Sequence, residues 1–161
     1  MMPRTLFGWV WLCAFVTGCK SDALMEINLP VESKGWTYDA PKVFSVNITD
    51  TSSRYNIYIN LRHSFHYEWR NMWVNVETMF PDSTYYNKRV NLPMSEPNGE
   101  WYGKCLGDNC DLQTPIQQYA RFPMPGTYKF TIRQDMRVNP LTGVKSIGMR
   151  IEKAAPPAPQ K

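Results

Sequence analysis

The residues of this chain best suited to covalent chemistry are its four cysteines. Cys13 and Cys19 lie close to the start of the sequence, whereas Cys105 and Cys110 lie five residues apart near its middle. A cysteine sulfur can act as a nucleophile, carry a lipid or close a disulfide. The sequence around each pair indicates which of these uses applies.

The first cysteine pair belongs to a predicted export leader. Arg4 supplies a positive charge, and residues 6–16 form an uncharged, mostly apolar run of eleven residues. A helix that spans a bilayer needs about 20 such residues, so this run is typical of a signal peptide. Val16-Thr17-Gly18 then leads directly into Cys19, as in a lipoprotein signal. We predict a signal peptide over residues 1–18 that takes Cys13 with it, the alternative being an ordinary secretory signal with a chance cysteine.

Lipidation at Cys19 would decide where the chain resides. We expect a diacylglycerol on the sulfur and a further acyl chain, such as palmitate, on the amine. Each buried methylene contributes about 0.8 kcal/mol, so two or three chains give a stable anchor. Asp22 is not the residue after Cys19, which by analogy with other Gram-negative lipoproteins favours the outer membrane. We expect the periplasmic face rather than the cell surface.

The second cysteine pair is predicted to form a disulfide. Residues 106–109 between Cys105 and Cys110 favour a turn, and an exported chain meets an oxidising compartment. A bridge over so short a loop would serve to pin that loop. The alternative of a zinc site needs two further ligands, but His63 and His66 are offset by three residues and would point to opposite faces of a strand. We therefore predict no metal site from these residues.

Two short segments could bind ligands. Residues 98–103 contain Trp101 and Tyr102 beside polar groups, as in sugar-binding β-sandwiches, although a core position for Trp101 is the preferred interpretation. Residues 107–111 carry three oxygen-bearing side chains that could hold calcium. Because calcium needs 6–8 oxygen ligands, a plain turn is preferred there, and we predict no cofactor beyond the lipid on Cys19.

Neither an enzyme nor a nucleic-acid-binding protein is indicated. The sequence lacks a nucleophile-elbow G-x-S-x-G, a phosphate-binding G-x-x-x-x-G-K-[ST] and a dinucleotide-binding G-x-G-x-x-G. Its net charge of +4 is scattered along 161 residues without a basic run. We expect a non-catalytic protein, with a hydrolase built on a carboxylate pair as the remote alternative.

The elements that must position these residues are predicted to be β-strands. Apolar residues alternate with polar ones through residues 44–49, 55–62, 72–78, 85–92, 128–132 and 144–151, and residues 116–122 are predicted to form a further strand. Residues 50–53 are interpreted as a hairpin loop, and a phase slip at residues 146–147 as a bulge near Gly148. The spacing predicts an all-β, antiparallel β-sandwich of immunoglobulin-like or jelly-roll type. One such domain would cover residues 36–153, between a tether over residues 19–35 and a Pro/Ala-rich tail over residues 154–161.

With these features in view, the chain resembles the GldH family, the gliding-motility lipoproteins of Bacteroidota. The resemblance rests on ordered segments behind the lipoprotein signal: residues 55–63, 67–74, 99–103, 122–137, 140–144 and 147–151. It implies an outer-membrane lipoprotein that works with the gliding and type IX secretion machinery and has no assigned catalytic activity. Cys105 and Cys110 do not belong to the family pattern.

The expected activity is therefore contact with other proteins of the cell envelope, such as other gliding or secretion lipoproteins. A predicted strand from residue 127 to 136 directs Tyr128 and Phe130 to the core and presents Lys129 and Arg133 on the other face. Together with Trp101 and Tyr102, these two cations form the predicted binding surface. The alternative function is that of a glycan-binding β-sandwich lipoprotein.

Overall fold

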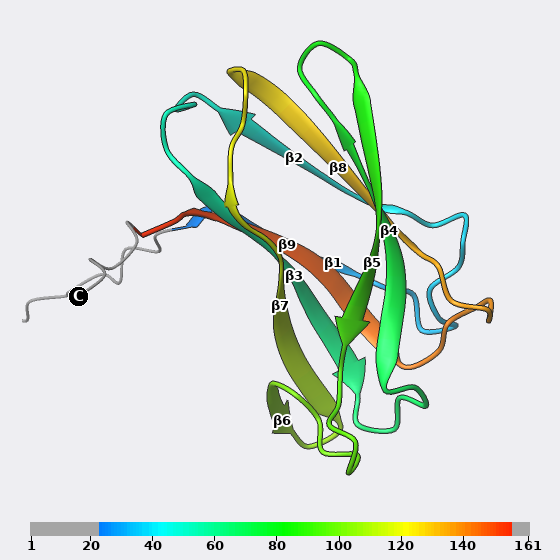
Figure 1. The fold of residues 1–161 in the computed structure, drawn as a ribbon. Helices are drawn as coiled ribbons and strands as arrows, with labels where there is room; N and C mark the ends of the chain where they lie inside the picture. Colours follow the sequence, from blue (N-terminus) through cyan, green and yellow to red (C-terminus); the bar gives the residue numbers. More distant parts are fainter. Residues whose placement is uncertain (1–22, 156–161) are drawn as a thin grey trace, which may run out of the picture.

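The computed structural model describes residues 23–155 and folds them into nine strands without a helix (Figure 1). The strands are β1 (Ala23–Pro30), β2 (Lys42–Ile48), β3 (Tyr55–Ser64), β4 (Asn71–Met79), β5 (Tyr85–Pro93), β6 (Lys104–Leu106), β7 (Asn109–Ala120), β8 (Gly126–Gln134) and β9 (Val144–Lys153). The predicted all-β class is confirmed. The predicted signal peptide, Cys19 and the tail from residue 156 onward lie outside the described residues.

Two antiparallel sheets form a sandwich. One has the strand order β1-β9-β3-β7-β6 and the other the order β2-β8-β4-β5. Without the short β6, each sheet holds four strands, in the orders β1-β9-β3-β7 and β2-β8-β4-β5. This is the strand order of a jelly roll, which decides between the two predicted sandwich types.

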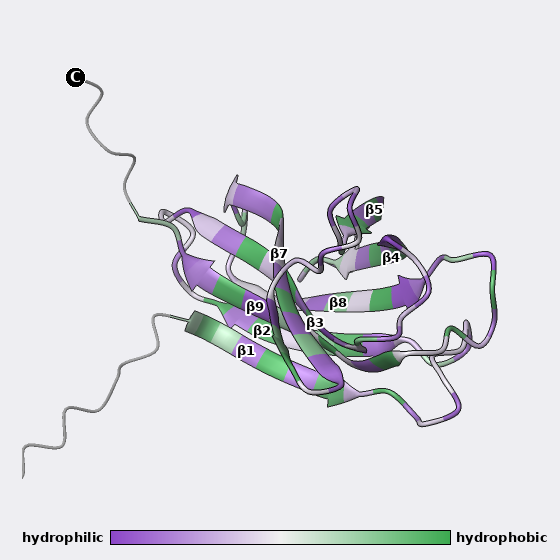
Figure 2. Cartoon of the chain, turned by 90° about the horizontal axis from the view of Figure 1, so that it is seen from below, coloured by the Kyte–Doolittle hydropathy of each residue, from purple (hydrophilic) through white to green (hydrophobic). Residues whose placement is uncertain are grey.

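The alternating sequence pattern fills the space between the sheets. Along β3, Tyr55, Ile57, Ile59 and Leu61 are buried while the residues between them are not, and Phe44, Val46 and Ile48 do the same on β2. Figure 2 shows this alternation as bands of hydrophobic and hydrophilic residues along the strands. Side chains of a strand point alternately to its two faces, so one face builds the core and the other is left for solvent or partners.

The predicted tether is too long. Its residues 23–30 form β1, which pairs with β9 and places Met25, Ile27 and Leu29 opposite Ile151, Met149 and Ile147. Met25 is buried and Leu29 is partly buried, which a solvated tether would not provide. β1 is an edge strand, and its buried and exposed residues do not alternate regularly, since Leu24 and Ile27 are both exposed. The β-sandwich domain therefore begins near residue 23 rather than residue 36.

Three further local predictions need correction. Residues 50–53 do not close a hairpin, because β2 and β3 belong to different sheets and the segment crosses between them. The bulge in β9 lies at Lys145, where the register with β3 shifts, and not at Gly148. Part of the presumed loop around the cysteines is the β6–β7 hairpin, whose two-residue turn begins at Gly107 with φ 58°.

Candidate binding surface

The outer face of the five-stranded sheet carries polar side chains in rows that run across the strands. One row consists of Glu26, Arg150 and Tyr58, and the next of Asn28, Gly148, Asn60 and Gln113. A third row consists of Ser146, Arg62 and Asp111. Residues far apart in the sequence thus become neighbours through strand register alone. We call the residues of these three rows, with Glu152, the polar face.

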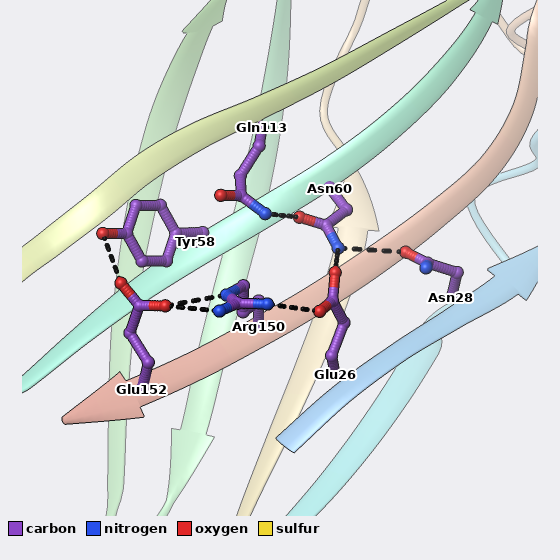
Figure 3. Close-up of polar contacts among 7 residues, drawn as sticks. All are labelled: Glu26, Asn28, Tyr58, Asn60, Gln113, Arg150 and Glu152. Carbon is purple, nitrogen blue, oxygen red and sulfur yellow. Dashed lines mark hydrogen bonds and ion pairs between the residues drawn. The ribbon is translucent and has the colours of Figure 1, made fainter. Parts of the chain in front are cut away.

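A continuous hydrogen-bond network joins the first two rows (Figure 3). The Gln113 amide donates to Asn60 Oδ1 at 2.9 Å, and Asn60 Nδ2 donates to Asn28 Oδ1 at 3.2 Å and to Glu26 Oε1 at 3.0 Å. Arg150 binds Glu26 at 2.5 Å, so side chains from β1, β3, β7 and β9 are held in one arrangement. Such a network fixes the orientation of every amide within it.

Arg150 extends the network to Glu152 and Tyr58. Its guanidinium donates to Glu152 Oε2 at 2.8 Å, and the Tyr58 hydroxyl donates to Glu152 Oε1 at 3.0 Å. The hydrogen bond to Glu152 raises the pKa of Arg150, and burial followed by the same carboxylate raises the pKa of Tyr58. Both groups therefore keep their protons at neutral pH and act there as fixed donors.

A hollow lies in this face among β1, β9, β3 and β7. Asn28 lies over Gly148, which has no side chain, and the small residue Ser146 lies two residues before Gly148 on β9. The hollow, of about 320 Å³, is bounded by the polar face residues Glu26, Asn28, Asn60, Arg62, Asp111, Gln113 and Ser146. It combines donors and acceptors that are held in place, which suits recognition of a polar partner or ligand.

Arg62 and Asp111 form one wall of the hollow. The guanidinium donates two hydrogen bonds to the carboxylate, at 2.7 and 2.8 Å. The hydrogen bond from Arg62 lowers the pKa of Asp111. A carboxyl group held ionised in this way does not supply a proton near neutral pH, so the pair is suited to binding rather than to general acid catalysis.

Trp101 and Tyr102 lie away from the polar face, in the segment between β5 and β6. Trp101 is half-buried, with its ring 4.7 Å from that of His63, and its indole N–H donates to the Phe65 carbonyl at 3.1 Å. It also packs at the margin of the core near Tyr67. This placement fits the preferred core interpretation better than an open platform for stacking on a sugar.

The structure joins Cys105 and Cys110 by a disulfide across the β6–β7 hairpin. Cys110 is buried and is paired in register with His63 on β3. The two carboxylates of the neighbouring segment turn to different partners, Asp108 to the Ser64 hydroxyl at 3.1 Å and Asp111 to Arg62. Residues 107 and 108 of this segment form the hairpin turn, and residues 109–111 begin β7.

Lys129 and Arg133 lie on β8, on the outer face of the other sheet. Both are exposed, and Arg133 lies 3.9 Å from Glu77 on β4. The predicted binding surface is thus divided between two parts of the molecule. Trp101 packs beside His63 and the Tyr102 N–H donates to the Met94 carbonyl, whereas these cations lie on β8. The structure does not bring the four residues together.

Sequence reasoning missed the polar face. Glu26 and Asn28 lay in the presumed tether, and Gln113 lay in the presumed loop before residue 116. Gly148 was noted only as the site of a bulge. The available signal was the polar half of the alternation on residues 55–62, which includes Tyr58, Asn60 and Arg62. That pattern shows which residues face outward but not what stands beside them on the neighbouring strands.

Comparison with known proteins supplies the relatives of this domain. A family model described as GldH lipoprotein matches residues 24–151, from β1 to β9. A protein of Christiangramia forsetii named gliding motility lipoprotein GldH homolog is 30% identical over 126 residues, which cover 74% of this chain and 78% of that protein. Gliding motility lipoprotein GldH of Flavobacterium johnsoniae is 26% identical over 124 residues, which cover 73% of this chain and 77% of that protein.

Proposed function

The chain belongs to the GldH lipoprotein family, and from this premise we propose that it is an outer-membrane lipoprotein of the gliding motility and type IX secretion machinery. In this proposal its β-sandwich is a non-catalytic module that binds other envelope proteins. The relatives' names supply the link to gliding motility. Membership confirms the resemblance found in the sequence.

The observation that carries the contact function is the polar face. Its amides and ion pairs are fixed by one another on four strands, so little conformational entropy is lost when a partner binds. Glu26, Asp111 and Glu152 each have a cation as a partner, which favours recognition over proton transfer. Complementary polar groups of this kind contribute mainly to specificity and association rate.

Anchoring through Cys19 would hold the domain close to the membrane. Only residues 20–22 separate Cys19 from β1, and four extended residue steps span at most about 14 Å. The end of the sandwich at Ala23, where β9 also finishes opposite β1, then faces the lipid (Figure 1). We place the domain on the periplasmic face of the outer membrane.

The test is affinity purification from crosslinked membranes. Asn60→Ala with Gln113→Ala removes the centre of the polar face, while Asn47→Ala with Thr127→Ala, at exposed paired positions of β2 and β8, changes the other sheet as a matched control. We expect the first pair to lose gliding or secretion proteins that co-purify with the native chain and the second pair to retain them. Retention by both pairs would remove the polar face from the proposal.

A second candidate function, saccharide binding, is favoured by the hollow itself. The carbonyl of Gln113 and the Nδ2 atom of Asn28 remain available at its rim beside Ser146, and sugar hydroxyls can both donate to and accept from such groups. Calorimetric titration with envelope polysaccharides distinguishes this function. Heat of binding to the native chain that disappears with the Asn60 and Gln113 variants would support saccharide binding. The absence of such heat with the native chain would exclude it.

A further inference from the structure

The sandwich is open along the side where β5 and β7 face each other. A cleft of about 250 Å³ lies between the sheets there, and its aromatic floor consists of the partly buried Phe80 beside the buried rings of Phe122, Tyr128 and Phe130. Phe122 and Phe80 pack edge to face against Tyr128, with ring centroids 4.7 and 5.5 Å apart. Tyr86 and Lys88 on β5 and Arg121 after β7 lie around the opening.

Residues of β5 that point toward the interior are left uncovered at this cleft. Tyr86 and Lys88 pair with Thr78 and Val76 of β4 and share their inward direction. Val76 is buried, yet Tyr86 is 57% exposed and Lys88 is also exposed. An inward position of a sandwich is normally buried, so the cleft is a place where the sheet lacks a cover.

The backbone of β5 is also unpaired on this side. β5 is the last strand of its sheet and bonds only to β4 among the described residues. Every second residue therefore directs its N–H and C=O groups outward, where an extended segment could bind them. On the opposite side of the cleft, Pro115 removes one donor from β7, so β5 is the better template.

The charges around the cleft indicate which kind of extended segment would bind there. β5 contains Lys88 and Arg89 and no acidic residue, and within residues 23–155 neither Lys88 nor Arg121 forms an ion pair. Antiparallel pairing of β5 with a second copy would bring these cations together, which disfavours a homodimer through this edge. A segment with an acidic residue opposite Lys88 would instead be attracted.

We infer that the β5 edge and its cleft bind an extended segment of a partner protein. The segment adds one strand to the four-stranded sheet, places an apolar side chain against Phe80 and Tyr86 and sets a carboxylate between Lys88 and Arg121. This mode is β-augmentation, in which the backbone supplies affinity and the pockets supply specificity. The inference deepens the proposed contact function and rests on it, but it concerns a different surface from the polar face.

The direct test uses a designed peptide as the probe. The fluorescein-labelled sequence Ser-Thr-Phe-Thr-Glu-Thr-Val-Thr-Ser presents Phe, Glu and Val on one face of a strand, and anisotropy reports its binding to the acylated chain in detergent. Lys88→Glu with Arg121→Glu is expected to weaken binding at least tenfold. The matched control, Lys104→Glu with Lys145→Glu, makes the same charge change at exposed positions outside the cleft and should alter binding less than twofold. Circular dichroism verifies that each variant is folded.

Two altered peptides separate the mechanisms. A peptide with Lys in place of Glu should bind the native chain poorly and regain affinity for the reversed variant. A peptide N-methylated at the amides that face β5 should not bind, because it cannot pair with the edge. Equal binding of the N-methylated peptide, equal binding to the reversed variant, or no binding of the parent peptide would overturn the inference. If the native chain does not bind the parent peptide but still co-purifies with envelope proteins, only this inference is contradicted. If the native chain binds the peptide but does not co-purify with envelope proteins, the proposed function is contradicted.

Discussion

The side-chain oxygen of Asn28 occupies the space that a Cβ atom would need at Gly148. This contact joins β1 to β9 at the centre of the polar face, because the same oxygen accepts the hydrogen bond from Asn60. The glycine is required by close approach of a neighbouring side chain. The geometry of the network therefore depends on the absence of a side chain at one position.

Gly148→Ala is expected to destabilise the fold and to disturb the network. The added methyl group collides with Asn28 and crowds the carbonyl of Ile27, and such overpacking costs about 1–3 kcal/mol. Denaturant unfolding measures the change. Combining the substitution with Asn28→Ala should recover part of the loss, and a double variant no more stable than Gly148→Ala alone would show that Asn28 is not the cause.

The stability of the fold should fall in acid through Asp50. Hydrogen bonds from Lys153, Ser53 and Ser52 hold the pKa of Asp50 well below its usual value of 3.8. A lowered folded-state pKa gives stability that is present above about pH 4 and is lost as pH falls further. Asp50→Asn should remove this dependence between about pH 4 and 2, whereas Glu68→Gln should not. If the free energy of unfolding falls between about pH 4 and 2 as much in Asp50→Asn as in the native chain, the assignment is contradicted.

His63 should add a second pH dependence at milder acidity. It is fully buried, its Nε2 atom has no hydrogen-bond partner, and burial lowers its pKa below 6.5. The native state thus disfavours the proton, so stability is fully present above about pH 6.5 and declines as pH falls toward the folded-state pKa. In His63→Phe the free energy of unfolding should change little between pH 6.5 and 5. An unchanged slope in that window would show that His63 does not cause it.

The amino-acid sequence was sufficient to predict the strands that build the interior of the sandwich but not the arrangement of residues on its surface. Residues 44–49, 55–62 and 128–132 were identified as strands because burial on one face forces apolar residues onto alternate positions. β1 was missed because it lies at the sheet edge, where exposed positions do not require a strict alternation of apolar and polar residues. The first half of β7 was missed because it contains polar residues and Pro115. The polar face requires the pairing register, since Glu26 and Arg150 are 124 residues apart.

Lipid attachment can be tested by metabolic labelling. Cys19→Ala should lose labelled palmitate and leave the outer-membrane fraction, because it removes the acceptor of the acyl chains. Cys105→Ser with Cys110→Ser provides the control, since these residues form a disulfide and should leave labelling unchanged. Undiminished palmitate on the Cys19→Ala protein would contradict the proposed anchor.

The most direct test of the proposed contact function is photo-crosslinking at the polar face in living cells. A photoreactive amino acid is placed at Gln113, and in a control protein it is placed at the exposed Asn47 of β2 in the other sheet. We predict a covalent product between position 113 and a protein of the gliding or secretion machinery, and loss of that product with Asn60→Ala while acylation and protein level stay unchanged. No such product at position 113, or one that persists equally with Asn60→Ala, would contradict contact through the polar face.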